Sequence, residues 1–155
     1  MLEAKRTEEG VTTVLEENKA VMHRIYEEIF NEGKLELADE LVAPDMVNHT
    51  APGAPRGPEP VKKLVAMLHN AFPDHHITIE DMVAEGDKVV MLNTYSGTHK
   101  GEFLGIAPTG KRFVQRQVHV MRFADGKVVE HWGLRDDLGQ MQQLGVIPSP
   151  EQPQV

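Results

Sequence analysis

The sequence predicts an α+β fold in which helices come first along the chain and a curved, mostly antiparallel sheet follows. Apolar residues recur at helical spacing up to about residue 72, and β-branched residues dominate from residue 76 onward. Two polar turns, "EGDK" and "ADGK", divide the second half into strand pairs. Helices that precede an antiparallel sheet commonly cover one face of it. Such a fold can enclose a pocket.

Length and composition indicate one globular domain. The chain has 155 residues, of which 40% are apolar and 26% are charged, and this suffices for a single hydrophobic core. We place the domain at residues 13–147, after a flexible N-terminus at 1–12. Residues 148–155, "PSPEQPQV", should form a polar C-terminal tail.

Charge and residue types argue against several classes of function. With 24 acidic and 16 basic residues the net charge is −8, which would repel a nucleic-acid backbone. No apolar run reaches the roughly 18 residues of a membrane helix, and "MLEAKRTEEG" lacks the apolar core of a signal peptide. We therefore expect a cytoplasmic protein with neither nucleic-acid nor membrane partners. Because the chain has no cysteine, disulfides, thiolate metal sites and a cysteine nucleophile are excluded.

Three helices are expected before the sheet. Thr13 and Glu16 have the spacing of a capping box, so a long helix should begin there and end near Gly33. Its apolar stripe consists of Met22, Ile25, Tyr26 and Ile29. A short helix is expected in "LELADELV", and a third follows the loop "APGAPRGPEP". Pro73 should end the third helix, because proline disfavours the helical conformation of the residue before it.

Four long strands and a closing helix are expected in the second half. "ITIEDMVAEGDKVVMLNTYSGTH" predicts one antiparallel pair, and "RFVQRQVHVMRFADGKVVEHWGLR" predicts another. "DLGQMQQLG" then predicts a short helix that ends at Gly145.

The stretch "VVEHWGLRDD" ends the last expected strand with two adjacent aspartates. Strand alternation places Trp132, Leu134 and Asp136 on one face and Asp137 on the other. If the first face is concave, the Asp136 carboxyl ends an apolar wall, where desolvation would raise its pKa and suit it to proton transfer. Asp137 would then cap the closing helix. The alternative is that both aspartates cap the helix or face solvent.

Polar side chains also mark the preceding strand. In "QRQVHVMRF", Gln115, Gln117 and His119 share one face, which is unusually polar for the inside of a sheet. The alternative is that this face is exposed and that Val118 and Val120 point inward. Although the chain has 8 histidines, they show no HxH or HExxH spacing, so we expect no metal site.

Three motifs resemble the SnoaL-like polyketide cyclase family, also called the ester cyclases. They are "AFPDHHITIEDMVAEGDKVV", "GTHKGEFLGIAPTGKRF" and "FADGKVVEHWGLRDDLGQMQQLG", in the family's order and at about its spacing. The resemblance implies a cone-shaped barrel of the nuclear transport factor 2-like (cystatin-like) superfamily, whose interior is the pocket. It also implies a homodimer or higher homo-oligomer that binds a small hydrophobic molecule and uses no cofactor.

The same resemblance suggests individual site residues. The family's acid/base aspartate lies four positions after the tryptophan of "EHW", which is Asp136 here, and a pocket histidine corresponds to His119. Asn48 and His49 match a polar position before the Pro/Gly loop, although His49 is equally well explained as a turn residue. His99 belongs to the "GTH" signature and either lines the pocket or organises the hairpin. The apolar wall should include Phe72, Phe103, Trp132 and Leu134.

The expected activity is an intramolecular aldol-type cyclisation of a small hydrophobic ester, as in relatives that close the last ring of aromatic polyketides. Asp136 would remove a proton from a carbon between carbonyls and return it to the new alkoxide. His119, with Asn48 or Gln117, would donate hydrogen bonds to the enolate oxygen. Two alternatives stay open: another cofactor-free isomerase, dehydratase or epoxide hydrolase, and a non-catalytic binder of a hydrophobic metabolite.

Overall fold

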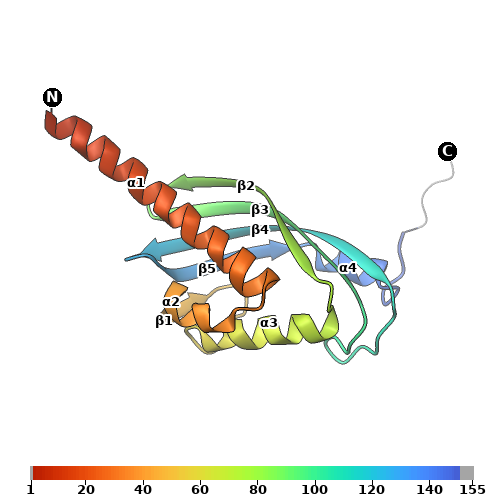
Figure 1. The fold of residues 1–155 in the computed structure, drawn as a ribbon. Helices are drawn as coiled ribbons and strands as arrows, with labels where there is room; N and C mark the ends of the chain where they lie inside the picture. Colours follow the sequence, from red (N-terminus) through yellow and green to blue (C-terminus); the bar gives the residue numbers. More distant parts are fainter. Residues whose placement is uncertain (1, 151–155) are drawn as a thin grey trace, which may run out of the picture.

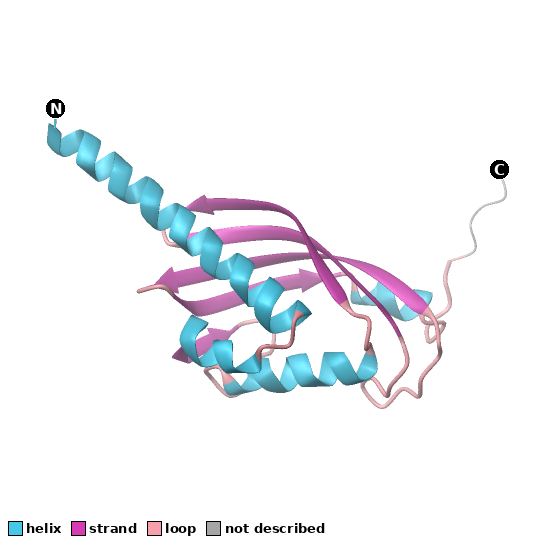
Figure 2. Cartoon of the chain, viewed as in Figure 1, coloured by secondary structure: helices cyan, strands magenta, loops and turns pink. Residues whose placement is uncertain are grey.

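A five-stranded curved sheet forms one layer of the molecule, and helices cover its concave side (Figures 1 and 2). The computed structural model describes residues 2–150. The strand order is β1-β5-β4-β3-β2, in which β1 is parallel to β5 and all other neighbours are antiparallel. The strands are β1 (Val42–Asn48), β2 (His76–Glu85), β3 (Lys88–Thr98), β4 (Arg112–Ala124) and β5 (Lys127–Arg135). The predicted α+β fold is therefore confirmed.

The first helix is longer than the capping box predicted. Helix α1 (Leu2–Arg24) begins before Thr13 and continues as a π-helical segment, η1 (Ile25–Asn31). Its predicted apolar stripe is buried, and the helix ends just before Gly33, whose φ is +74°. The start at Thr13 was thus wrong, whereas the stripe and the end at Gly33 are confirmed. Within residues 2–150, none of the helices is both long and apolar enough to cross a membrane.

The second predicted helix is short and leads into a strand that the sequence did not predict. A 3-10 turn, η2 (Leu35–Leu37), precedes α2 (Ala38–Leu41), and β1 begins at the next residue. Pro44 and Asp45 within β1 are unusual in strands, but β1 is an edge strand, where a missing backbone N–H is tolerated.

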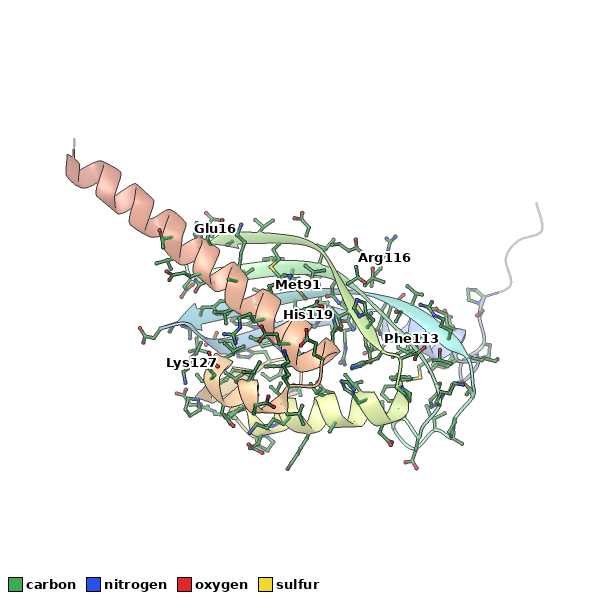
Figure 3. The ribbon with its side chains drawn as sticks, viewed as in Figure 1. Glu16, Met91, Phe113, Arg116, His119 and Lys127 are labelled. Carbon is green, nitrogen blue, oxygen red and sulfur yellow. The ribbon has the colours of Figure 1, made fainter. Side chains whose placement is uncertain are left out.

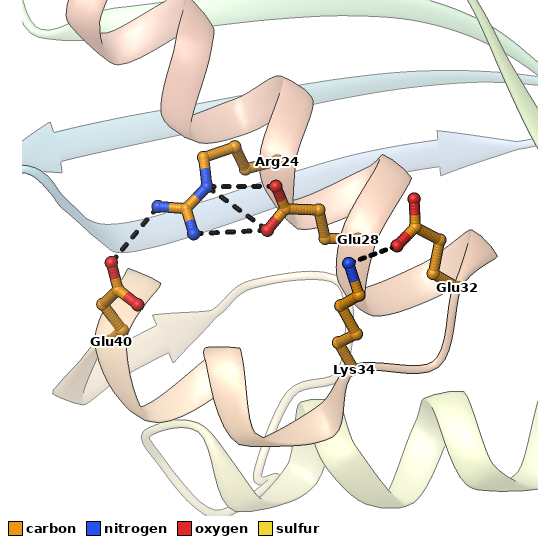
Figure 4. Close-up of polar contacts among 5 residues, drawn as sticks. All are labelled: Arg24, Glu28, Glu32, Lys34 and Glu40. Atoms are coloured by element: carbon orange, nitrogen blue, oxygen red, sulfur yellow. Dashed lines mark hydrogen bonds and ion pairs between the residues drawn. The ribbon is translucent and has the colours of Figure 1, made fainter.

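Ion pairs attach the end of α1 to α2. The Arg24 guanidinium pairs with Glu28 in η1 and reaches Glu40 on α2 at 3.2 Å (Figure 4). The three side chains are 29–60% exposed, so each pair contributes about 1 kcal/mol or less. Burial of the apolar stripe therefore supplies most of the attachment.

Helix α3 (Glu59–Ala71) lies beneath the sheet and ends at Phe72, as Pro73 predicted. Phe72 is fully buried against four aromatic rings, those of Tyr95, His99, Phe103 and Phe113. The closing helix α4 (Asp137–Gln143) follows β5 directly, and Gly145 after it has φ +77°. Part of the predicted tail, residues 151–155, lies outside the described residues.

A β-bulge in β5 decides which of its side chains face the helices. Phe123 pairs with Val128, but Arg122 pairs with Glu130, so Val129 is an extra residue in β5. Beyond the bulge, His119 lies opposite Gly133. A hairpin without the bulge would instead place His119 opposite Trp132, because one extra residue shifts the pairing by one and reverses the faces.

Candidate active-site cavity

A cavity of about 430 Å³ lies between the inner face of the sheet and the helices. Its apolar lining comes mainly from the helices, a strand and the loop between β3 and β4: Phe30, Leu64, Met67, Leu68, Ile77, Phe103, Leu104 and Met141. Its polar lining comes mainly from β4, β5 and the segments that follow β1 and β5: Asn48, Thr50, Gln115, Gln117, His119, His131, Arg135, Asp137 and Gln140. Polar and apolar side chains thus line different walls of the cavity.

Strand β4 provides the central row of polar groups. Gln115, Gln117 and His119 point inward and are 2%, 8% and 6% exposed, whereas Val118 points outward. Figure 3 shows His119 near the middle of the molecule and Arg116 on the opposite side of the sheet from the helices. The alternative in which Val118 and Val120 form the inner face is therefore excluded.

The amides of this row form a directed hydrogen-bonded chain. The Gln117 Nε2 donates to Gln115 Oε1 at 2.8 Å, and the Gln115 Nε2 donates to the Asp137 carboxylate at 3.0 Å. Asn93 Nδ2, from β3, donates to Gln117 Oε1 at 3.0 Å. Arg135 Nε lies 3.5 Å from the same Asp137 oxygen. This series of hydrogen bonds runs from the buried side chain of Gln117 to the more exposed carboxylate of Asp137.

Two imidazoles extend this chain in the other direction. His119 Nε2 lies 2.9 Å from Gln117 Oε1, and His119 Nδ1 lies 2.8 Å from His131 Nε2. His131 Nδ1 in turn lies 3.0 Å from Asn48 Oδ1. Every ring nitrogen of the pair therefore has a polar neighbour from the protein.

The surroundings of the pair oppose its protonation. Burial lowers the pKa of His119 to about 3, with His131 and Arg135 adding to the effect. Burial likewise lowers the pKa of His131 to about 4, helped by Arg135 and His49. The cavity wall therefore contains neutral imidazoles at neutral pH, which can accept a proton.

The structure exchanges the predicted positions of the two aspartates. Asp136 is exposed and lies outside the cavity lining, and its carboxylate accepts the Gly139 N–H at 2.9 Å as the N-cap of α4. Asp137 lines the cavity instead. The bulge at Val129 is the reason, because it turns the face that contains Asp136 away from His119.

Three further residues that we expected in the pocket, two apolar ones and one histidine, lie outside it. Leu134 is 78% exposed on the outer face. Trp132 is half-buried and stacks on His49 with ring centroids 4.7 Å apart, so both side chains lie outside the cavity lining. His49 therefore packs against the outer surface of β5.

Phe72 and His99 belong to the core beside the cavity and do not line it. His99 Nδ1 accepts the Thr109 backbone N–H at 3.2 Å and lies 3.1 Å from the Thr109 hydroxyl, which ties the ends of the β3–β4 loop together. Of the two interpretations of His99, the structure supports the hairpin-organising one. Phe103 lines the cavity as expected, as do Asn48 and Gln117.

The sequence reasoning missed several groups that line the cavity. His131, Arg135 and Asp137 were assigned to the opposite face, and Tyr26 and Tyr95 were not considered beyond their place in a helix or strand. Burial raises the pKa of both tyrosines, so both phenols stay neutral hydrogen-bonding groups. The sequence did contain one indication of the histidine pair: His119 and His131 lie on either side of the turn that joins β4 and β5, so the hairpin can bring them together. Among residues 2–150, no three His, Asp or Glu side chains gather closely enough to hold a metal ion.

Comparison with known proteins identifies the family. The model of the SnoaL-like polyketide cyclases matches residues 20–144. The chain belongs to this family. The SnoaL-like match spans every element that lines the cavity, from η1 to α4.

Two of the relatives are named as ester cyclases. The nogalonic acid methyl ester cyclase of Streptomyces nogalater is 34% identical over 119 residues, covering 75% of this chain and 89% of the relative. The aklanonic acid methyl ester cyclase DnrD of Streptomyces peucetius is 33% identical over 132 residues, covering 80% and 89%.

Solved structures agree with this placement. TsrD from Streptomyces laurentii superposes with a TM-score of 0.78 at 30% identity, covering 84% of this chain and 96% of TsrD. IdmH from Streptomyces antibioticus superposes with a TM-score of 0.73 at 36% identity, covering 83% and 99%. The SnoaL-like fold is thus shared along most of each chain.

Proposed function

We propose that this SnoaL-like protein catalyses an intramolecular aldol-type cyclisation of a small hydrophobic ester inside the cavity, without a cofactor. The proposal rests chiefly on one observation: a continuous hydrogen-bonded row of His119, Gln117 and Gln115 lies along one wall of an otherwise apolar cavity. Such a site can move a proton and stabilise an enolate while it excludes water.

In this proposal His119 takes the acid/base role that we had assigned to Asp136. Its neutral imidazole accepts the proton of a carbon that lies between carbonyls, and the electron pair of the broken C–H bond becomes an enolate. The enolate carbon attacks a carbonyl of the same molecule, which forms the new C–C bond and an alkoxide. The alkoxide recovers the proton from the imidazolium, so no atom is gained or lost.

Arg135 and the amide row stabilise the negative charge that develops. Arg135 lines the cavity and is held by Asp137. Gln117 has a second amide hydrogen besides the one given to Gln115. Donors held in place before the reaction favour the enolate without reorganisation. Phe103 and the α3 side chains opposite would hold a flat substrate against this wall.

The test is turnover of aklanonic acid methyl ester and nogalonic acid methyl ester, the compounds for which the relatives are named. We expect wild-type turnover and a loss of about 100-fold or more in His119→Gln. Asp136→Asn is the matched control, because Asn caps a helix about as well as Asp and the residue lies outside the cavity. Tight binding of both esters without turnover would favour the binding-protein alternative, and loss of turnover in Asp136→Asn would return the catalytic role to Asp136.

We propose in addition that the outer face of the sheet pairs with a second copy of the chain. Leu92, Val118 and Leu134 lie in one row across three strands and are 50%, 37% and 78% exposed. Arg116 on β4 and Glu80 on β2 flank this row, so a twofold arrangement could pair opposite charges. Light scattering should show a dimer, and Leu134→Glu should yield monomer; a monomeric wild type would contradict this.

A further inference from the structure

The polarity of the hydrogen bond at the Asn48 end of the histidine pair is determined by the backbone. The Thr50 N–H donates to Asn48 Oδ1 at 3.0 Å, which identifies that atom as the amide oxygen. The same oxygen faces His131 Nδ1 at 3.0 Å. Since an amide oxygen only accepts, a hydrogen bond here requires a proton on His131 Nδ1.

The polarity at the other end is determined by a carboxylate. Asp137 accepts, so Gln115 presents its Nε2 to it and its Oε1 to Gln117. Gln117 therefore turns its own oxygen toward His119 Nε2 and also accepts from Asn93. A hydrogen bond here requires a proton on His119 Nε2.

These two constraints leave the pair one proton short. The contacts Asn48–His131, His131–His119 and His119–Gln117 need three ring protons, whereas two neutral imidazoles carry only two. If both outer contacts are made, two lone pairs meet between the rings at 2.8 Å. If the inner contact is made, one outer nitrogen presents a lone pair to an amide oxygen. Uptake of one proton would complete all three hydrogen bonds.

The charges around the pair keep the third proton away in the empty protein. Arg135 on β5 and His49 after β1 oppose it, and burial opposes it most. The Tyr26 ring of η1 packs 5.3 Å from the His119 ring as a neutral phenol, while Asn93 on β3 and Asn48 on β1 carry no charge. Asp137 acts only through two intervening amides. A developing enolate would supply the missing negative charge.

We propose that His119 and His131 act together as a single proton acceptor, whose third hydrogen-bonding proton comes from the substrate. This inference rests on the proposed function and adds His131 to it as the positioning partner of His119. The C–H bond of the substrate breaks, its electron pair forms the enolate, and the proton binds the outer ring nitrogen that presents a lone pair to an amide oxygen, which completes the third hydrogen bond. The pair then returns that proton to the alkoxide, so the three-proton state exists only while the substrate bears the charge.

The first test is the tautomeric state of the two rings in the empty protein near neutral pH, from 15N NMR of the imidazole nitrogens. A head-to-tail pair has both rings protonated on Nδ1 or both on Nε2. We expect one of these two matched states. An imidazolium near neutral pH would overturn the proposal, because the pair would then already hold its third proton.

The second test is an acid titration of the same resonances. We expect both rings to respond together, with a common midpoint and a total uptake of one proton, before any second proton binds. In His131→Gln the remaining ring should titrate alone, whereas His76→Gln, an exposed residue on β2, should leave the joint titration unchanged. Two separate one-proton titrations in the wild type would overturn the proposal.

Neither test uses a substrate, so the pair and the proposed function can fail separately. Joint titration in a protein that turns over neither ester would leave the shared proton established and the cyclisation of these two esters refuted. Independent titration in an active enzyme would refute the pair alone. If the enzyme is active, His131→Gln should lower kcat about tenfold or more with little change in KM. A purely structural role of His131 would not change the proton count.

Discussion

Strands β4 and β5 lie side by side in the sheet, yet only β4 follows one uninterrupted alternation. From Phe113 to Phe123 every second side chain of β4 is buried. In β5 the inward side chains are Val128 and then His131, three residues apart, because Val129 forms a bulge. The sequence pattern of β4 therefore predicts which of its residues share a face along the whole strand, whereas the pattern of β5 does so only up to the bulge.

The comparison also shows that hydropathy alone misassigns β5. Its apolar residues Trp132 and Leu134 lie on the outer face, and Gly133 and Arg135 lie on the inner one. The outer face is where we propose that a second copy binds, so both faces of β5 would be covered in a dimer. A two-faced strand carries no clean hydrophobic signal.

Two single-residue deletions test the bulge most strongly. Deleting Trp132 would move Leu134 into the place opposite His119 and turn Arg135 outward, so we expect a loss of more than about 4 kcal/mol in unfolding free energy. Deleting Val129 removes the bulge but keeps the face of every later residue, so we expect about 1–3 kcal/mol. Urea unfolding followed by circular dichroism measures both. Equal effects of the two deletions would contradict the role of the bulge.

Adjacent residues on opposite faces of β5 provide a finer test. An added Cβ at Gly133 would lie 2.9 Å from His119 Nδ1 and 3.1 Å from the Thr50 hydroxyl. We expect Gly133→Ala to cost about 1–3 kcal/mol and to separate the two imidazoles. Leu134→Ala, at a site that is 78% exposed, should cost about 0.5 kcal/mol or less in the monomer. Unchanged histidine resonances in Gly133→Ala would argue against the close approach.

The buried histidines predict how stability depends on pH. Folding lowers the pKa of His119 and His131 from 6.5 to about 3 and about 4. The unfolded chain therefore binds protons first, so stability is full above pH 6.5 and falls as the pH drops toward the folded pKa values. The slope is at most about 1.4 kcal/mol per pH unit for each ring. Burial also lowers the pKa of His75, so His75 likewise makes the protein less stable as the pH falls.

Urea unfolding at several pH values between about 6.5 and 4.5 measures this slope. His131→Gln should reduce this slope by the share of one ring. A slope that His131→Gln does not alter would show that the imidazole is already solvated in the folded protein.

The two aspartates after β5 give the smallest and most selective effect. Asp136→Ala should cost about 1 kcal/mol through loss of the α4 cap and leave turnover unchanged. Asp137→Asn should barely change stability, because the side chain is 59% exposed, but it should lower turnover about tenfold by releasing Gln115 and Arg135. Turnover assays and thermal unfolding of both variants test whether Asp137, and not Asp136, contributes to the cavity. The opposite pattern would restore the assignment made from alternation.

Much of the fold was accessible from local signals. The stop at Gly33, the end of α3 before Pro73 and the two hairpin turns depend on residues close in sequence. Strand β1 was missed because Pro44 and Asp45 disfavour strands, and only its edge position beside β5 makes them acceptable.

By itself, the sequence determined the two hairpins β2–β3 and β4–β5, the alternation that places Gln115, Gln117 and His119 on one face of β4, and the motifs that resemble the SnoaL-like family. Local propensity and alternation are enough for the first two, whereas the family motifs are recognised only by their resemblance to other sequences. The tertiary structure decided that His131 and Asp137 enter the cavity while Trp132 and Asp136 do not. The phase of β5 depends on one bulged residue, and a bulge is a property of the pairing between two strands rather than of either strand alone.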